Sequence, residues 1–176
     1  MVDLVRAALD AGAFKAYVLP VEKIPFDPGL RAYCEANACG TYGKNYGCPP
    51  YVGTTDEVIA RVKEYENILV FQTVGQLEDS FDFEGMTEAA ARHKALVSEL
   101  YESVKGELGR SMPLSAGGCP VCGKCAKLEE KPCRFPEKAI SSLEAHCINV
   151  STLAGKCGMK YINGANTVTY FGAILF

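Results

Sequence analysis

The chain has 176 residues, the length of one ordinary domain, and its 18 basic and 21 acidic side chains give a formal net charge of −3. A chain of this length buries roughly 70% of its unfolded surface on folding, so it needs no disulfides to fold. Because Lys and Arg are scattered and not clustered, the charge argues against nucleic acid or an anionic membrane as the main partner.

The termini and the cysteine count indicate a compartment. The first twenty residues, MVDLVRAALDAGAFKAYVLP, carry acidic side chains where a signal peptide needs an unbroken apolar stretch, and the run TVTYFGAILF is too short to cross a bilayer. We therefore expect a cytoplasmic protein without a membrane partner. Nine cysteines in a reducing compartment favour metal or redox chemistry over disulfides.

The first part of the chain predicts a strand followed by a long loop. Apolar and polar residues alternate over residues 14–19, which is typical of a strand. A short helical piece is expected next, running into Cys34. Residues 37–53 are rich in Gly, Tyr, Asn and Pro, as in an ordered loop, and loops of this length in a compact domain are often functional.

The middle of the chain predicts a helix, a strand and a second helix. Thr54 and Glu57 form a capping box, which begins a helix over about 55–66. The apolar, β-branched run at 67–74 predicts a central strand buried on both faces. An acidic loop then leads to a long helix, which we expect to begin at a cap formed by Thr87.

The long helix presents one apolar stripe, and Gly109 is expected to end it. The stripe repeats at helical spacing and consists of His93, Leu96, Val97, Leu100, Val104 and Leu108. Because His93 lies on the inward face, we expect a partly buried, hydrogen-bonded imidazole.

The last part of the chain predicts a short strand at 111–117 and a closing strand at about 167–175. Between them, Ser141 and Glu144 have the spacing of a second capping box, which predicts a helix over about 142–156.

Helices and strands alternate along the chain, which favours an α/β fold. We expect a single layered domain over residues 1–176, with a sheet of about four strands and flanking helices. Two cysteine-rich segments, residues 34–50 and 117–136, would lie on loops that leave this scaffold, where chemistry is usually found.

The segment GGCPVCGKCAKLEEKPCRFP gathers four thiols, at Cys119, Cys122, Cys125 and Cys133. A regular helix would spread the first three around its surface, whereas a coiled loop brings them together, and glycines let backbone N–H groups approach a ligand. A C-x2-C-x2-C triplet followed by a fourth cysteine is the pattern that holds a 4Fe-4S cluster. Thiolates also bind zinc, usually as two separated pairs, so zinc is the alternative.

A second group, Cys34-x4-Cys39-x8-Cys48, ends in CPP and predicts a second metal site, because the surrounding loop has little apolar periodicity to bury. With three cysteines, one iron of a 4Fe-4S cluster lacks a thiolate and is open to water or substrate. The alternative fourth ligand is Cys147 or Cys157, although both continue an apolar stripe and are more typical of core thiols.

Four further side chains are candidates for a role beside these metal sites. Arg134 follows Cys133 and is a candidate to bind an anionic substrate or stabilise a negatively charged cluster, with a surface salt bridge as the alternative. Tyr42 and Tyr46 are candidates to orient a substrate. His146 could be a ligand, but we expect it to be exposed on its helix.

The cysteine segments resemble a prokaryotic family of predicted metal-binding proteins, the domain of unknown function 2284. The matching pieces are C-x4-C-x8-CPP at 34–50, CPVCGKCAKLEEKPCRFPEKAISSLEAHCINV at 119–150 and the closing VTYFGAILF, which together span most of the chain. The resemblance implies cysteine-bound metal, with iron-sulfur as the expected form and no established reaction. The chain departs from the family in carrying Cys147 where a glycine is expected after the EA pair.

Three hypotheses follow. The first is an iron-sulfur protein with one or two 4Fe-4S clusters that transfers electrons to or from a protein partner, which requires the two cysteine groups to lie near each other. The second is an enzyme whose open iron acts on a small-molecule substrate. The third is a zinc-binding structural module. No nucleophile elbow, P-loop or GxGxxG motif supports a hydrolase or a nucleotide-binding protein.

Overall fold

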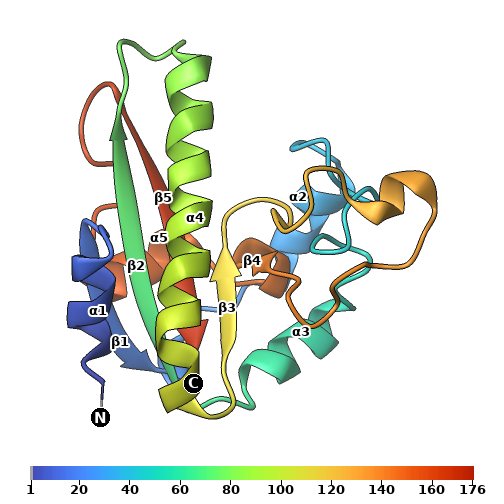
Figure 1. The fold of residues 1–176 in the computed structure, drawn as a ribbon, viewed down its shortest axis with the longest axis horizontal. Coiled ribbons are helices and arrows are strands. Elements are labelled where there is room, and N and C mark those ends of the chain that lie inside the picture. The colour runs from blue at the N-terminus through green and yellow to red at the C-terminus, as the bar shows by residue number, and fades with distance from the viewer. Residues whose placement is uncertain (1) are drawn as a thin grey trace.

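A five-stranded sheet organises the protein, which is described here over residues 2–176 from a computed structural model (Figure 1). The strand order is β1-β2-β5-β3-β4. The pairs β1–β2, β2–β5 and β5–β3 are antiparallel, and the pair β3–β4 is parallel. The strands are β1 (Lys15–Pro20), β2 (Asn67–Gln76), β3 (Met112–Ser115), β4 (Ser141–Ser142) and β5 (Thr167–Leu175). The predicted α/β fold is confirmed, with five strands in place of about four.

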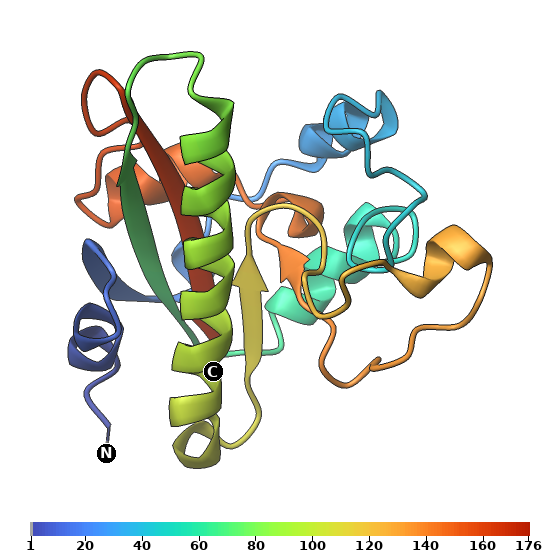
Figure 2. The same ribbon diagram turned by 45° about the horizontal axis from the view of Figure 1, so that its top comes forward.

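Helices cover both faces of this sheet, and a separate lobe lies beside it (Figures 1 and 2). The α-helices are α1 (Leu4–Asp10), α2 (Arg31–Glu35), α3 (Thr55–Val62), α4 (Phe83–Leu108) and α5 (Val150–Lys156). Helix α4 runs along one face and α5 lies behind the other. Residues 28–62 and 117–140 together form the lobe, which we call the cysteine lobe. Within residues 2–176, no helix is both long and apolar enough to cross a bilayer.

Strand β2 divides the core into two layers. Leu69 and Phe71 pack with α4 and α1 on one face, whereas Ile68 and Val70 pack with α5 on the other. All four side chains are fully buried. Because successive side chains of a strand point to opposite faces, a continuous apolar run needs cover on both sides, so the predicted central strand is confirmed.

Helix α4 begins four residues before the predicted cap. Asp82 is the N-cap, and its carboxylate accepts a hydrogen bond of 2.8 Å from the Gly85 N–H. Such a side chain satisfies an amide that has no partner within the helix. Thr87 lies inside the helix, and its hydroxyl donates to the Phe83 carbonyl at 2.8 Å. The helix ends before Gly109, whose φ of 64° suits glycine, as predicted.

The predicted helix over 142–156 is wrong in its first half. Its first residue, Ser142, belongs to β4 instead and pairs with Ser115 of β3. The chain then makes a 3-10 turn and reaches Cys147, whose φ of 59° cannot continue a helix. The α5 helix starts only at Val150, where Asn149 caps it by accepting from a backbone N–H. The left-handed φ at Cys147 explains why glycine is expected there.

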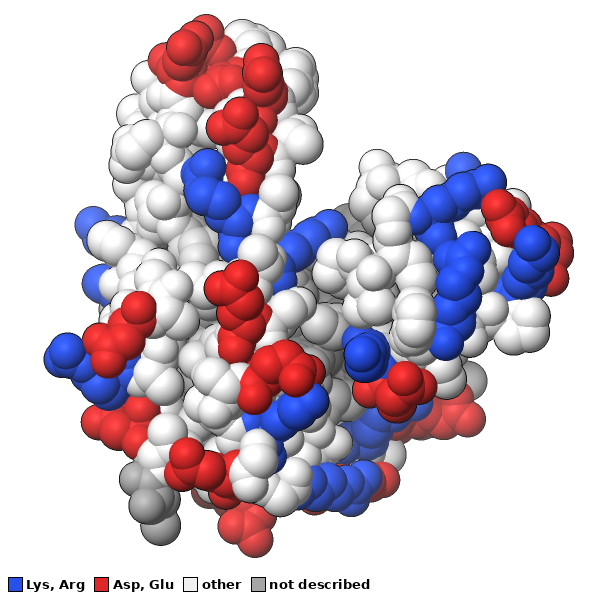
Figure 3. All heavy atoms as spheres, in the orientation of Figure 1, with Lys and Arg blue, Asp and Glu red and all other residues white. Residues whose placement is uncertain are grey.

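Figure 3 shows how the two parts of the molecule face solvent. Acidic and basic side chains are interspersed over the visible face, and a notch separates the upper part of the sheet and α4 from the cysteine lobe. The lobe is joined to the sheet through β3 and β4, so the strands fix the position of the cysteine loops.

Gly172 allows β5 to pack closely under α4, and its replacement should destabilise the core. A Cβ at this position would lie 2.7 Å from the Phe71 ring and 2.9 Å from a Val97 methyl. Because cores are close-packed, we expect Gly172→Ala to lower the free energy of unfolding by about 1–3 kcal/mol. Chemical denaturation measures this, and Gly106→Ala is the control. Gly106 lies exposed in α4 with no atom within 4 Å of a Cβ, so its replacement should stabilise the protein; equal effects would contradict the prediction.

Candidate metal centre

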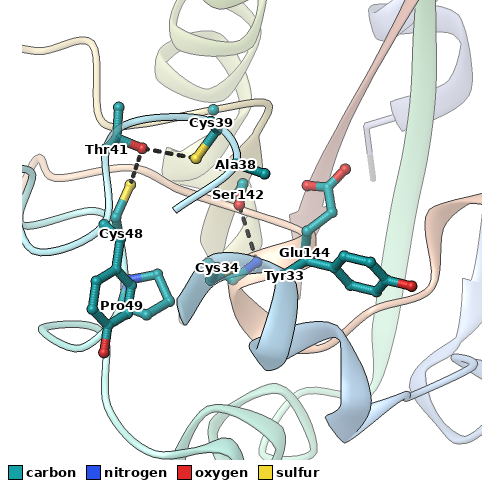
Figure 4. Close-up of a pocket in the computed structure, with 12 residues that line it drawn as sticks. Tyr33, Cys34, Ala38, Cys39, Thr41, Cys48, Pro49, Ser142 and Glu144 are labelled. Carbon is teal, nitrogen blue, oxygen red and sulfur yellow. Dashed lines mark hydrogen bonds between the residues drawn. The ribbon is translucent and has the colours of Figure 1, made fainter. Parts of the chain in front are cut away.

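The first cysteine group surrounds one cavity in the cysteine lobe (Figure 4). Cys34 lies on α2, and Cys39 and Cys48 lie on the turns that follow it. All three line a cavity of about 270 Å³, which we call the three-Cys cavity. Its volume approaches the lower end of the range for small-molecule sites, about 300 Å³. The sequence groups these three thiols, and the fold places them around one space.

Thr41 connects two of these thiols, a role that the sequence did not predict. Its hydroxyl oxygen lies 3.2 Å from the Cys39 sulfur and 3.4 Å from the Cys48 sulfur (Figure 4). Having a single proton, the hydroxyl donates to one sulfur and accepts from the other. The hydrogen bond from the Thr41 side chain, followed by one from its backbone, lowers the pKa of Cys39. Burial raises the pKa of Cys34 and of Cys48, so Cys39 becomes a thiolate most readily.

The second cysteine group lines a neighbouring, smaller cavity. Its four thiols are half-buried, and they share this cavity of about 20 Å³, which we call the four-Cys cavity. Its cysteines are Cys119, Cys122, Cys125 and Cys133. The Ile140 N–H donates a hydrogen bond to the Cys119 sulfur at 3.4 Å.

The donor sets of both cavities consist of thiols, which are soft ligands that bind iron-sulfur clusters, zinc or copper(I). In residues 2–176, no three His, Cys, Asp or Glu side chains converge closely enough to hold one metal ion. Thiolates around one zinc, with bonds of about 2.3 Å, crowd together, whereas thiolates around a 4Fe-4S cluster lie farther apart. The four-Cys cavity has room for about one water, so the 119–136 loop must open to admit a cluster.

The two cavities lie side by side because Asn45 holds the two cysteine loops together. Its side-chain oxygen accepts from the N–H of Cys119 at 3.1 Å and of Gly47 at 2.8 Å, and its amide donates to the Cys119 carbonyl at 3.3 Å. Gly47 approaches so closely that a Cβ would lie 2.9 Å from the Cys119 Cβ. Cys48 and Cys119, one from each group, therefore lie on adjacent segments.

The three candidate accessory residues also reach these cavities. Arg134 lines the four-Cys cavity, donates to the Lys124 carbonyl at 2.9 Å and lies 3.9 Å from the Glu129 carboxylate. It therefore lies both at the wall of a thiol cavity and near a surface carboxylate, and its role toward a cluster or an anionic substrate stays a prediction. Tyr46 lines the same cavity, and Tyr42 lines the three-Cys cavity.

Cys147, Cys157 and His146 line neither thiol cavity. Cys147 is fully buried in a small apolar cluster, and Cys157 packs in the core, where burial raises its pKa to about 11. The prediction that His146 is exposed is wrong, since only 1% of it is accessible. Its Nδ1 donates to the Ser142 carbonyl at 3.0 Å, and its Nε2 lies 3.4 Å from an Arg61 nitrogen, so both ring nitrogens are engaged.

The family of proteins described as "Predicted metal-binding protein (DUF2284)" matches residues 17–176, which include both cysteine groups and all five strands except the first two residues of β1. The chain belongs to this family. The match confirms the resemblance drawn from the cysteine spacing, and the family description extends to metal binding without naming a metal. No curated protein and no solved structure was found to match the chain.

Proposed function

We propose that this family member is a cytoplasmic iron-sulfur protein that transfers single electrons to or from a protein partner. One 4Fe-4S cluster would bind in the four-Cys cavity and a second in the three-Cys cavity. The observation that carries the proposal is that two sets of cysteines, far apart in the sequence, line two adjacent cavities. Bound clusters would supply one-electron redox chemistry.

Residues of the chain support this function in three ways. Thr41 keeps Cys39 and Cys48 on one side of their cavity and favours the thiolate form of Cys39. The Ile140 N–H donates to the Cys119 sulfur, and hydrogen bonds to sulfur are among the features that set the potential of iron-sulfur clusters. Asn45 fixes the distance between the two loops, so that an electron has a short path from one site to the other.

A second candidate function is catalysis at an open iron, and the number of thiols in the three-Cys cavity favours it. The cavity is lined by Tyr42 and Glu144 beside its three thiols, so one iron of a 4Fe-4S cluster bound there would lack a cysteine ligand. The four-Cys cluster would then supply electrons. If this is the function, Cys48→Ala should abolish turnover while the protein keeps its other cluster; retained turnover would exclude the mechanism for the substrate tested.

Metal analysis of protein purified without oxygen tests the main proposal. We expect about eight irons and about eight acid-labile sulfides per chain, as two 4Fe-4S clusters require. Cys122→Ala and Cys39→Ala should each lose about half, because each removes a ligand from a different cavity.

The matched control is Cys157→Ala, which removes a buried thiol that lines neither cavity and should keep all of the iron. About four irons, lost only in Cys122→Ala, would leave one cluster and assign Cys34, Cys39 and Cys48 another role. Zinc without iron or sulfide would overturn the redox function and favour the structural zinc module.

A further inference from the structure

Arg31 is a cation without an anionic partner. Its Nη1 donates to the Gly53 carbonyl at 2.7 Å and its Nη2 to the Ala145 carbonyl at 3.2 Å. The third nitrogen, Nε, is buried and has no hydrogen-bond partner. Within residues 2–176, no Asp or Glu forms an ion pair with it. A part-buried charge in this position is costly unless an opposite charge lies near it.

The guanidinium of Arg31 binds the carbonyl of a residue that lines the three-Cys cavity. Arg31 begins α2 and Cys34 follows three residues later, a spacing that places two side chains on the same face of a helix. Ala145, whose carbonyl binds Arg31, also lines the cavity.

We propose that Arg31 is the counter-cation of a cluster bound by Cys34, Cys39 and Cys48. The inference rests on the proposed function, since it needs a metal cluster in this cavity. Three thiolates on a 4Fe-4S core of charge 2+ carry a net charge of −1, and one electron from a reductant makes this −2. A nearby fixed cation stabilises the reduced state more than the oxidised one, so Arg31 raises the reduction potential of this cluster.

The other arginines near the cysteines are engaged differently. Arg134 is more exposed and lies within ion-pair distance of Glu129, so solvent and the carboxylate offset its charge. Arg61 donates to the Val52 carbonyl at 3.0 Å and lies against His146, which lines neither thiol cavity. Of these three arginines, Arg31 is the one that binds a residue lining the three-Cys cavity and forms no ion pair.

Redox titration of three variants tests this role. Arg31→Gln removes the charge, Arg31→Lys keeps it but loses the planar fork that binds two carbonyls, and Arg110→Gln removes a charge that pairs with Glu64 on the surface. Iron content and the midpoint potential of each cluster are measured by dithionite titration followed by electron paramagnetic resonance. We expect Arg31→Gln to shift one cluster to a more negative potential or to lose about half of the iron, whereas Arg31→Lys and Arg110→Gln resemble the wild type.

Each result decides the inference. Wild-type potentials and iron in Arg31→Gln would overturn it, as would an equal shift in Arg31→Lys, which would indicate that Arg31 only braces the loop. If Arg31→Gln does not fold, Arg31→Lys decides, because a wild-type potential supports the counter-cation and a shifted one excludes it. A wild-type protein without iron would instead refute the proposed function itself, and iron that Cys39→Ala retains in full would show that the three-Cys cavity holds no cluster.

Discussion

Replacing Gly47 with alanine is expected to remove iron from the protein. A Cβ on this residue would lie 2.7 Å from the Ile140 carbonyl oxygen and 2.9 Å from both the backbone nitrogen and the Cβ of Cys119. Two of these atoms belong to the backbone and cannot rotate away, so the two cysteine loops must separate. Because Cys48 and Cys119 lie on the segments that would move, we expect Gly47→Ala to lose half or more of the bound iron.

The same substitution should lower the free energy of unfolding by about 1–3 kcal/mol, as overpacking does elsewhere. Iron content and thermal denaturation measure the two effects. Gly155→Ala is the control, since Gly155 lies in α5, lines neither thiol cavity and has no atom within 4 Å of a Cβ. Full iron content in Gly47→Ala would show that the contact between the loops does not maintain the metal sites.

Acid should destabilise the protein through two buried histidines. His93 is fully buried and His146 nearly so, and burial lowers the pKa of each from 6.5 to about 4. Between these pH values the unfolded chain binds a proton at each histidine and the folded protein does not. The stabilising effect is therefore complete above pH 6.5 and is lost as the pH falls toward 4, by roughly 3 kcal/mol per histidine.

Chemical denaturation at pH 7 and at pH 4.5 measures this loss. His93 is the better residue to replace, because it lies in the α4 core, away from the cysteine lobe, and bonds to Thr73 at 2.9 Å through Nδ1. We expect His93→Gln to be less stable than the wild type at pH 7 but to lose less stability on acidification. Acid release of a metal would affect both proteins alike, so an unchanged difference between the two pH values would contradict the prediction.

The sequence predicted those elements whose signal is local. The continuous apolar run of β2 indicates a strand covered on both faces, and the apolar stripe of α4 indicates a helix covered on one face. Both elements are found where the sequence predicted them. Thr54 and Glu57 form the predicted capping box, with both reciprocal hydrogen bonds present. Ser141 and Glu144 have the same spacing and form none, because pairing of β4 with β3 takes precedence over the local preference. That pairing joins two segments that are separate in the sequence, so the residues of β4 alone do not predict it.

In the candidate site, too, the features with a local signal were predicted and those that depend on distant contacts were not. Cysteine spacing divided the seven thiols into two groups, and each group lines one cavity, whereas their role as metal ligands stays a prediction. Thr41, Asn45 and Arg31 were not predicted. Asn45 matters through a bond to a residue 74 positions away, and Arg31 through the Ala145 carbonyl, 114 positions away, so their roles depend on the assembled fold.

The hydrogen bonds of Asn45 between the two cysteine loops also limit the stage of synthesis at which the proposed metal sites can form. During synthesis Cys34, Cys39 and Cys48 emerge first, but the partner of Asn45 follows only after β2, the whole of α4 and β3 have been made. Until then the early cysteines lack the neighbour that fixes their loop, and contacts between distant segments form late in folding. In the proposed two-cluster protein, the three early thiols would therefore wait for metal until Cys119 has been made, and the cell would have to protect them until then.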